Sequence, residues 1–189
     1  MLPAQRSYAQ EPTVRMEMAS TIIEAGGDPF TASVVVENVT NLGAFQFDLT
    51  YDPAIVGFVE VQEGPFLGSS GREVKCLPPR SGEGSAGLTC VTLGATPDGP
   101  NGSGVLATIT LQPAAPGSSP LHLVRLTLTD PPGQALPAQA QDATVIVTAN
   151  NGEGGGFAWA LWGTVIGGVV VAVAAAGGVA WWVRRSRPA

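Results

Sequence analysis

The sequence predicts an all-β sandwich followed by one membrane-spanning α-helix. Short runs rich in Val, Ile, Thr and Phe recur along residues 13–148, and Gly, Pro, Asn or Asp bounds each of them, as is typical of strands joined by turns. No helical period lies between these runs, which favours an antiparallel β-sandwich of Greek-key or jelly-roll type. The stretch 157–183 has no charged residue and exceeds the roughly 20 residues that cross a bilayer core.

Nine runs are expected to form the strands of this sandwich. The clearest is 44–52, where Phe45, Phe47, Leu49 and Tyr51 alternate with smaller or polar residues. A period of two places the aromatic set on the core face and the other set on the outer face. The nine runs are residues 13–18, 31–39, 44–52, 55–62, 72–77, 87–94, 105–112, 121–129 and 143–148.

The stretch 157–183 is interpreted as a single transmembrane helix, because only a helix satisfies its own backbone in lipid. Two tryptophans lie at each end, where indole rings favour the headgroup level, and three arginines follow at once. The basic tail, 184–189, is therefore expected in the cytoplasm, the N-terminal domain outside the cell membrane, and the Gly-rich segment 149–156 as a flexible linker. The four tryptophans are Trp159, Trp162, Trp181 and Trp182, and the three arginines are Arg184, Arg185 and Arg187.

Two smaller features concern the ends of the chain. Gly163 and Gly167 form a GxxxG pair, which would favour a homodimer of the helix; the alternative is a simple anchor that tolerates glycine. Residues 1–12 contain Ser7-Tyr8-Ala9, the small-x-small form of a signal-peptidase site, without an apolar segment before it. We interpret this stretch as a leader that carries the end of a signal peptide; a chance match is the alternative.

The two cysteines, Cys76 and Cys90, lie in strand-like runs joined by a loop rich in Pro, Gly and Ser. Oxidising compartments favour a disulfide between them. A bridge that closes a loop of this size contributes about 3 kcal/mol in the chain-entropy model. Two buried free thiols are the alternative.

Charge and motifs argue against nucleic-acid binding and catalysis. All 15 Asp and Glu precede residue 157, together with six of the nine Lys and Arg, so the outer part carries a net charge of −9. Such a domain lacks the clustered cations that phosphate contacts need. The one histidine, His122, shares a phase with Val124, Leu126 and Leu128, which predicts a structural position near the core. No nucleophile elbow, metal triad or phosphate loop occurs, so the prediction is no enzyme, no metal and no cofactor.

Residues 39–64, VTNLGAFQFDLTYDPAIVGFVEVQEG, contain an alternating aromatic strand led by Gly43, a Tyr51-Asp52-Pro53 turn and a strand ending in Gly64. With the later runs GVLATITLQ and 143–148, they make the chain resemble the cohesin family over about residues 13–148. The resemblance implies a nine-stranded antiparallel jelly-roll sandwich. Cohesins bind dockerins, small calcium-loaded modules of secreted enzymes, so the resemblance also implies docking of dockerin-bearing proteins in polysaccharide catabolism. Together with the anchor predicted above, this gives a membrane-anchored, extracytoplasmic binding module.

In cohesins the outer face of the strand before Tyr-Asp-Pro supplies Asn and Asp to the dockerin. The resemblance therefore makes Gln46, Asp48 and Thr50 candidate partner contacts, although the first matching positions are Ala44 and Gln46, which departs from that pattern. The alternative for these residues is an ordinary solvated sheet face. Any calcium is expected on the partner, because this chain has no EF-hand-like run of Asp and Asn.

Two other functions stay open at this point. Carbohydrate-binding modules share the cohesin superfamily, so the domain could bind polysaccharide at the cell surface, although its outer part contains no Trp for stacking on sugar rings. A structural or adhesive surface domain is the other alternative, since sandwiches carry unrelated functions.

Overall fold

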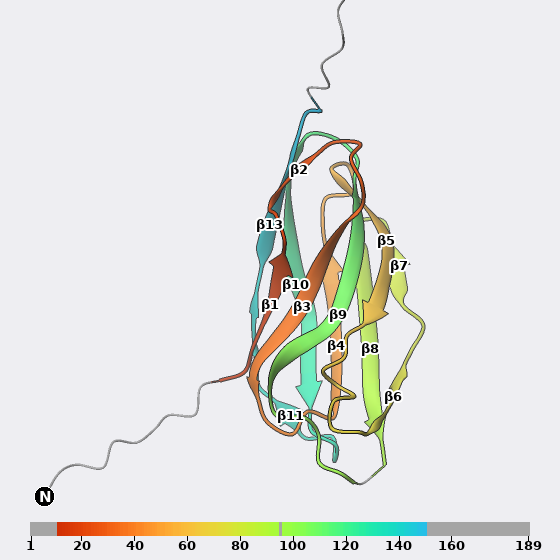
Figure 1. The fold of residues 1–189 in the computed structure, drawn as a ribbon, viewed down its shortest axis with the longest axis vertical. Helices are drawn as coiled ribbons and strands as arrows, with labels where there is room; N and C mark the ends of the chain where they lie inside the picture. Colours follow the sequence, from red (N-terminus) through yellow and green to blue (C-terminus); the bar gives the residue numbers. More distant parts are fainter. Residues whose placement is uncertain (1–10, 95, 151–189) are drawn as a thin grey trace, which may run out of the picture. The chain divides into compact units, whose positions relative to one another are not determined.

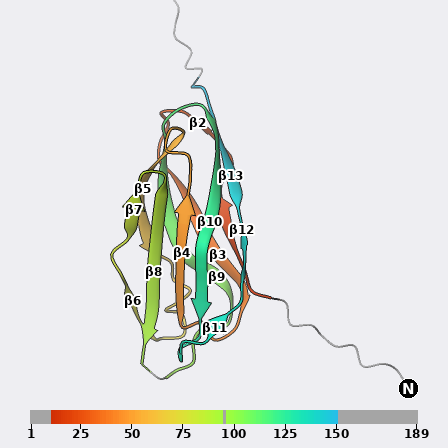
Figure 2. The ribbon, with the colours of Figure 1, turned by 180° about the vertical axis from the view of Figure 1, so that it is seen from behind.

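The computed structural model describes residues 11–94 and 96–150, which form two β-sheets packed face to face (Figures 1 and 2). One sheet has five strands in the order β12-β1-β3-β9-β5. The other runs β2-β13-β10-β4-β8-β6, with β11 paired to β10 and β7 paired to β8. The strands are β1 (Thr13–Met18), β2 (Ile22–Glu24), β3 (Phe30–Val39), β4 (Ala44–Thr50), β5 (Val56–Glu63), β6 (Glu73–Cys76), β7 (Arg80–Gly82), β8 (Ser85–Leu93), β9 (Gly102–Pro113), β10 (Gly117–Thr129), β11 (Ala135–Leu136), β12 (Gln139–Gln141) and β13 (Ala143–Thr148).

All nine predicted runs overlap strands of the sandwich, so the all-β prediction is confirmed for this part of the chain. The structure adds four short strands, β2, β7, β11 and β12, each of two or three residues. It also departs from a purely antiparallel arrangement, because β1 pairs with β12 and β13 pairs with β2 in parallel. Segments this short carry no readable period, so their pairing depends on the strand beside them.

Both terminal segments of the sandwich pass from one sheet to the other. β1 belongs to the five-stranded sheet and β2 to the eight-stranded sheet, while β12 and β13 make the same change with only Asp142 between them. The Asp142 carboxylate holds this crossing, because its Oδ1 accepts the Leu123 backbone N–H of β10 at 3.0 Å. These exchanges join the two sheets along one side of the sandwich (Figure 2).

The core is set by the inward phase of β4, as the alternation predicts. Phe45, Phe47 and Leu49 are buried, and the two phenyl rings stack with centroids 6.2 Å apart. Their neighbours on β8 and β10 face the same way: Phe47 is paired with Leu88, and Leu49 with Leu123. Val and Leu side chains of the five-stranded sheet complete the core from the other side.

The prediction that His122 lies near the core is wrong. Its side chain is half exposed, and Leu121 and Leu123 on either side of it are buried instead. The register of β10 against β4 shifts by one residue between Val124 and Thr127, so the strand contains a β-bulge. One extra residue reverses the phase of everything beyond it, which is why a single alternation through the whole run fails.

Cys76 and Cys90 form a disulfide, as predicted, with a Cα–Cα distance of 4.0 Å. The two residues are directly paired between β6 and β8. The bridge closes a sequence separation of 14 residues and attaches the edge strand β6 to the buried middle of β8.

Buried Arg72 holds the loop between β8 and β9. Its Nε–H donates to Thr92 Oγ1 at 2.8 Å, and its two Nη groups donate to the carbonyls of Pro97 and Gly94. The Thr92 hydroxyl in turn donates to the Gly43 carbonyl at 2.9 Å. One guanidinium thereby ties this loop to the start of β4.

Several expectations lie outside the described residues. These are most of the leader at 1–12, most of the linker at 149–156, the membrane helix at 157–183 with Gly163 and Gly167, and the basic tail at 184–189. Within residues 11–94 and 96–150, no helix has the length and apolar character that crossing a membrane requires.

Candidate functional site

The residues predicted as partner contacts lie on the outer face of the eight-stranded sheet. Gln46 lies between Thr89 of β8 and Thr127 of β10, and Thr50 lies between Ser85 and His122. Both side chains are half-buried. We call the outward side of β6, β7, β8, β4 and β10 the β4 face, and it is the side turned towards the viewer in Figure 2.

Asp48, the third predicted contact, lies at the centre of an ion cluster that covers it. Its side chain is only 6% exposed. Arg80 of β7 donates from Nη2 to Asp48 Oδ1 at 2.7 Å, and Arg125 of β10 contacts Oδ2 from the other side. Arg80 also donates from Nη1 to Thr89 Oγ1 at 2.9 Å. The carboxylate is therefore a buried anchor, and the two guanidinium groups present themselves to solvent in its place.

Gly87 makes the approach of Arg80 geometrically feasible. Arg80 is paired with Gly87, which is paired on its other side with Asp48. A Cβ at Gly87 would lie 2.1 Å from Asp48 Oδ1 and 3.1 Å from Arg80 Nη2. The missing side chain thus lets a residue of the edge strand reach across β8 to the middle of the sheet.

The bulge in β10 brings Arg125 to the cluster. Arg125 has a φ of 50°, in the left-handed backbone region that residues other than Gly and Asn rarely adopt. Without the extra residue, position 125 would follow the outward Val124 and face the core. Bulges re-aim side chains in this way, and this one directs a guanidinium to the outer face.

Neither arginine was singled out from the sequence. Arg80 lies 32 residues from Asp48 along the chain, and no local pattern links the two. A signal for the bulge at Arg125 was present, because the apolar phase of LHLVRLTLT changes from Leu121 and Leu123 to Leu126 and Leu128 on its two sides. It would have indicated the bulge, though not the contact with Asp48.

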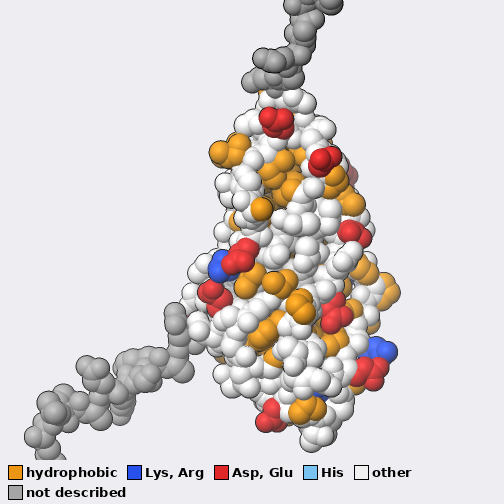
Figure 3. All heavy atoms as spheres, viewed as in Figure 1, with side chains coloured by type: hydrophobic (Ala, Val, Ile, Leu, Met, Phe, Trp, Pro, Cys, Tyr) orange, Lys and Arg blue, Asp and Glu red, His pale blue; other side chains and the backbone are white. Residues whose placement is uncertain are grey.

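The two outer faces of the sandwich differ in charge. The strands of the β4 face contain Lys75, Arg80 and Arg125 against Asp48 and Glu73, a net charge of +1. The outward residues of the five-stranded sheet include one cation and three carboxylates, a net charge of −2. Figure 3 views that sheet from outside and shows Asp and Glu side chains spread over it. The three carboxylates belong to Glu17, Glu37 and Glu60, whereas Glu63 is paired with buried Ala107 and contacts Cys76 of the other sheet.

Of the large apolar side chains exposed in the described residues, four lie on or beside the β4 face and one, Val59, on the five-stranded sheet. Val91, Leu93 and Val124 point outwards from its strands, and exposed Leu77 follows β6 directly. Val124 is paired with Asp48, so an apolar side chain lies beside the ion cluster. A surface that combines arginine with apolar residues resembles the centre of protein–protein interfaces.

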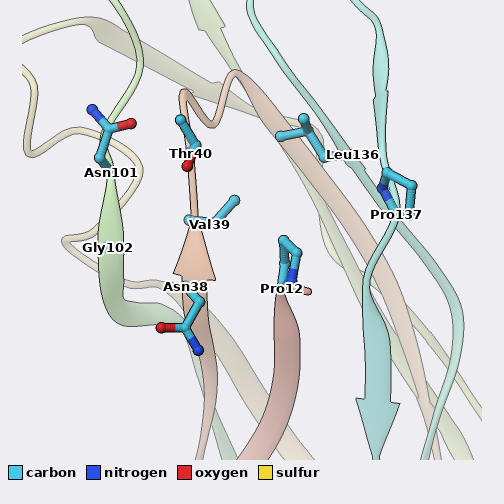
Figure 4. Close-up of a pocket in the computed structure, with 8 residues that line it drawn as sticks. All are labelled: Pro12, Asn38, Val39, Thr40, Asn101, Gly102, Leu136 and Pro137. Carbon is cyan, nitrogen blue, oxygen red and sulfur yellow. The ribbon is translucent and has the colours of Figure 1, made fainter. Parts of the chain in front are cut away.

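A hollow lies at the end of the sandwich where β3 ends and β9 begins, with a volume of about 480 Å³. Figure 4 shows the amides of Asn38 and Asn101 on one side of it and Leu136 and Pro137 on the other. Asn101 is already engaged, since its Oδ1 accepts the Asn41 backbone N–H at 2.9 Å. None of its lining residues is ionisable, so the hollow offers shape without acid–base or charge chemistry.

The part of the chain that the structure describes gives little support for metal binding or for sugar stacking. Glu63 lies close to Cys76 and Cys90, but the sulfurs are joined in a disulfide and are not thiolate ligands for a metal. Aromatic platforms for sugar are likewise missing from residues 11–94 and 96–150, where Tyr and Phe side chains are buried or half-buried.

At one edge of the β4 face, His122 Nδ1 and Asp142 Oδ2 lie 2.8 Å apart. This hydrogen bond, with a smaller contribution from the Leu123 N–H, lowers the pKa of the Asp142 carboxyl below its ordinary value of 3.8. The pair fastens the crossing between β12 and β13 to β10.

We expect Gly87→Ala to destabilise the domain by about 1–3 kcal/mol, because the new Cβ would collide with Asp48 and with the Phe47 carbonyl at 2.8 Å. Denaturant unfolding of the two proteins measures the difference. Gly57→Ala is the matched control, since a Cβ there meets nothing nearer than 4.0 Å. Equal losses in both variants would show that Gly87 has no special role beside Asp48.

We expect the stability that Asp142 contributes to depend on pH. Its pKa is lowered by folding, so the contribution is present above the unfolded pKa of about 3.8 and is lost as the pH falls through the folded value. Asp142→Asn should reduce the free energy of unfolding near neutral pH by about 0.5 kcal/mol, since solvent screens this half-exposed pair, and by less in acid. Exposed Glu83→Gln serves as control. A difference between wild type and Asp142→Asn that is constant with pH would contradict the assignment.

Comparison with known proteins identifies the family to which this fold belongs. A model of the cohesin domain matches residues 19–131. A search of curated proteins found no match. Among solved structures, a type II cohesin from the cellulosome of Acetivibrio cellulolyticus has a TM-score of 0.62 at 16% identity, over 72% of this chain and 95% of that one.

Two further structures have the same fold. A non-cellulosomal cohesin from the archaeon Archaeoglobus fulgidus has a TM-score of 0.59 at 15% identity, over 75% of this chain and 94% of its own. The sixth cohesin of scaffoldin B from Acetivibrio cellulolyticus, solved in complex with a mutant Cel5 dockerin, has a TM-score of 0.61 at 11% identity, over 73% and 99%. With a family model that matches most of the described sandwich, the chain belongs to the cohesin family.

Proposed function

We propose that this chain is a membrane-anchored, extracytoplasmic cohesin that docks dockerin-bearing proteins through its β4 face. Membership of a family of non-catalytic binding modules supports the binding role. The observation that carries the choice of face is the contrast between the two sheets: the β4 face has a net positive charge and three outward apolar side chains, whereas the five-stranded sheet is acidic.

Gln46, Thr50 and the arginines around Asp48 are the proposed contact residues. Gln46 and Thr50 lie in the outward phase of the central strand β4 and keep part of their surface open to solvent. Asp48 acts indirectly, because Arg80 and Arg125 cover it. Solved relatives crystallised with dockerins support a dockerin as the class of partner.

The partner's parent protein is proposed to be a polysaccharide-degrading enzyme. The cellulosomal origin of a structural relative supports this part of the proposal. The archaeal relative is described as non-cellulosomal, so a role outside cellulosomes is compatible with the same fold. Sequencing the captured partner decides between these roles. Direct binding of polysaccharide is less well supported, because the described residues offer no exposed aromatic ring.

We expect a dockerin-bearing protein to be retained when secreted proteins of the source organism pass over the immobilised chain in calcium, and to be released by a chelator. Thr127→Arg should weaken retention at least about tenfold, because it adds a long side chain that obstructs the exposed β10 position beside Gln46. Thr31→Arg, the same change at an exposed position of β3 in the other sheet, is the control and should bind as wild type.

Two results would contradict this assignment. Equal loss of binding in Thr127→Arg and Thr31→Arg would remove the preference for the β4 face. Depletion of the domain by insoluble polysaccharide, with no protein retained, would favour the carbohydrate-binding function instead.

The anchor is proposed from the uncharged stretch 157–183 and the arginines that follow it. We expect the full chain to stay in the membrane pellet after alkaline carbonate extraction and a chain ending at residue 150 to be released. A full chain that is extracted as readily as the shortened one would contradict anchoring.

A further inference from the structure

The cluster of Arg80, Asp48 and Arg125 has hydrogen-bond donors to spare. A guanidinium carries five N–H donors, and one carboxylate can pair with a single guanidinium in the bidentate manner. Here two guanidiniums share Asp48, and within the described residues Arg125 forms no ion pair or hydrogen bond other than this ion pair, while its side chain is 71% exposed. The cluster therefore has a net positive charge and unpaired donors that face solvent.

The choice of residues at these positions points beyond a structural role. The bulge itself has a packing reason, since it returns Leu128 to the core. A left-handed backbone position is, however, occupied more easily by Gly or Asn than by Arg. Arg at position 125 is explained by what its side chain presents on the outer face. On the other side, the absence of a side chain at Gly87 leaves the room that Arg80 needs to reach Asp48.

The space around the cluster is suited to the end of one side chain. Asp48, Arg80, Ser81, Ser85 and Arg125 line a shallow cavity of about 120 Å³. Sites for whole small molecules are several times larger, at roughly 300–1,000 Å³. Two guanidiniums and nearby hydroxyl-bearing residues match a carboxylate, which accepts hydrogen bonds through both oxygens.

We infer that the Arg80–Asp48–Arg125 cluster receives an acidic side chain of the docked partner, so that the β4 face selects a module with Asp or Glu at the centre of its own binding surface. This inference rests on the proposed function. Val124 beside the cluster and Val91 further along the face supply the apolar contacts that surround a central charge pair. Asp48 orients the two arginines and does not touch the partner.

Arg125→Gln tests the inference, because it removes one charge while Arg80 still pairs with Asp48. Calorimetry measures the Kd between the full chain in detergent and the recombinant dockerin module that wild type retains. Arg125→Gln should raise Kd about 10- to 100-fold, and Arg125→Glu should raise it further. Arg15→Gln is the control, since Arg15 pairs with Glu17 and Glu37 on the other sheet, and should leave Kd unchanged.

Changing each Asp and Glu of the module to its amide then completes a double-mutant cycle. One such change should weaken binding as much as Arg125→Gln, and the two together should weaken it little further. An unchanged Kd in Arg125→Gln overturns the inference and leaves the proposed function in place. The inference is also overturned if Arg125→Gln weakens binding but no Asp or Glu of the module shows coupling to it in the cycle. That result would favour a small anion as the ligand of the cluster. If no dockerin module binds wild type at all, the proposed function fails and the inference fails with it.

Discussion

The alternation of strand β4 is the constraint on which the rest of the domain depends. Phe45, Phe47 and Leu49 fill the middle of the core, and their neighbours on β8 and β10 follow their phase. A slip of one residue would turn Asp48 into the core and the phenyl rings into water, and an unpaired buried charge is among the most unfavourable changes a fold can suffer. The core and the outer face are thus set together by the seven residues of this strand.

The same register places a carboxylate at the centre of the outer face, where two features of neighbouring strands make its burial tolerable. Gly87 on β8 leaves room for Arg80, and the bulge of β10 supplies Arg125. The resulting cluster exposes cations on a domain that is otherwise acidic. Together with Val91 and Val124 it gives this face the mixture of charge and apolar surface found where proteins bind each other. The register that folds the core therefore also holds the two arginines on the outer face.

Much of the fold could be predicted because its signals are local. The nine strand runs and the inward phase of β4 follow from alternation and turn residues, and the Cys76–Cys90 bridge from two cysteines in neighbouring strand runs of an expected extracytoplasmic domain; all of them are present. The failures have a physical cause as well. Strands of two or three residues have no period to detect, and one extra residue in β10 reversed the phase assigned to His122.

By itself the sequence determined the strand-rich class, the side chains of the core and the resemblance to cohesins, because each depends on residues close together in the chain. Only the tertiary structure decided which distant residues meet. Asp48 contacts Arg80 across Gly87, and it contacts Arg125 on the adjacent strand β10, through a register that is settled when two sheets close over a shared core. That register arises from the packing of all strands at once, and so no single stretch of the sequence contains the site.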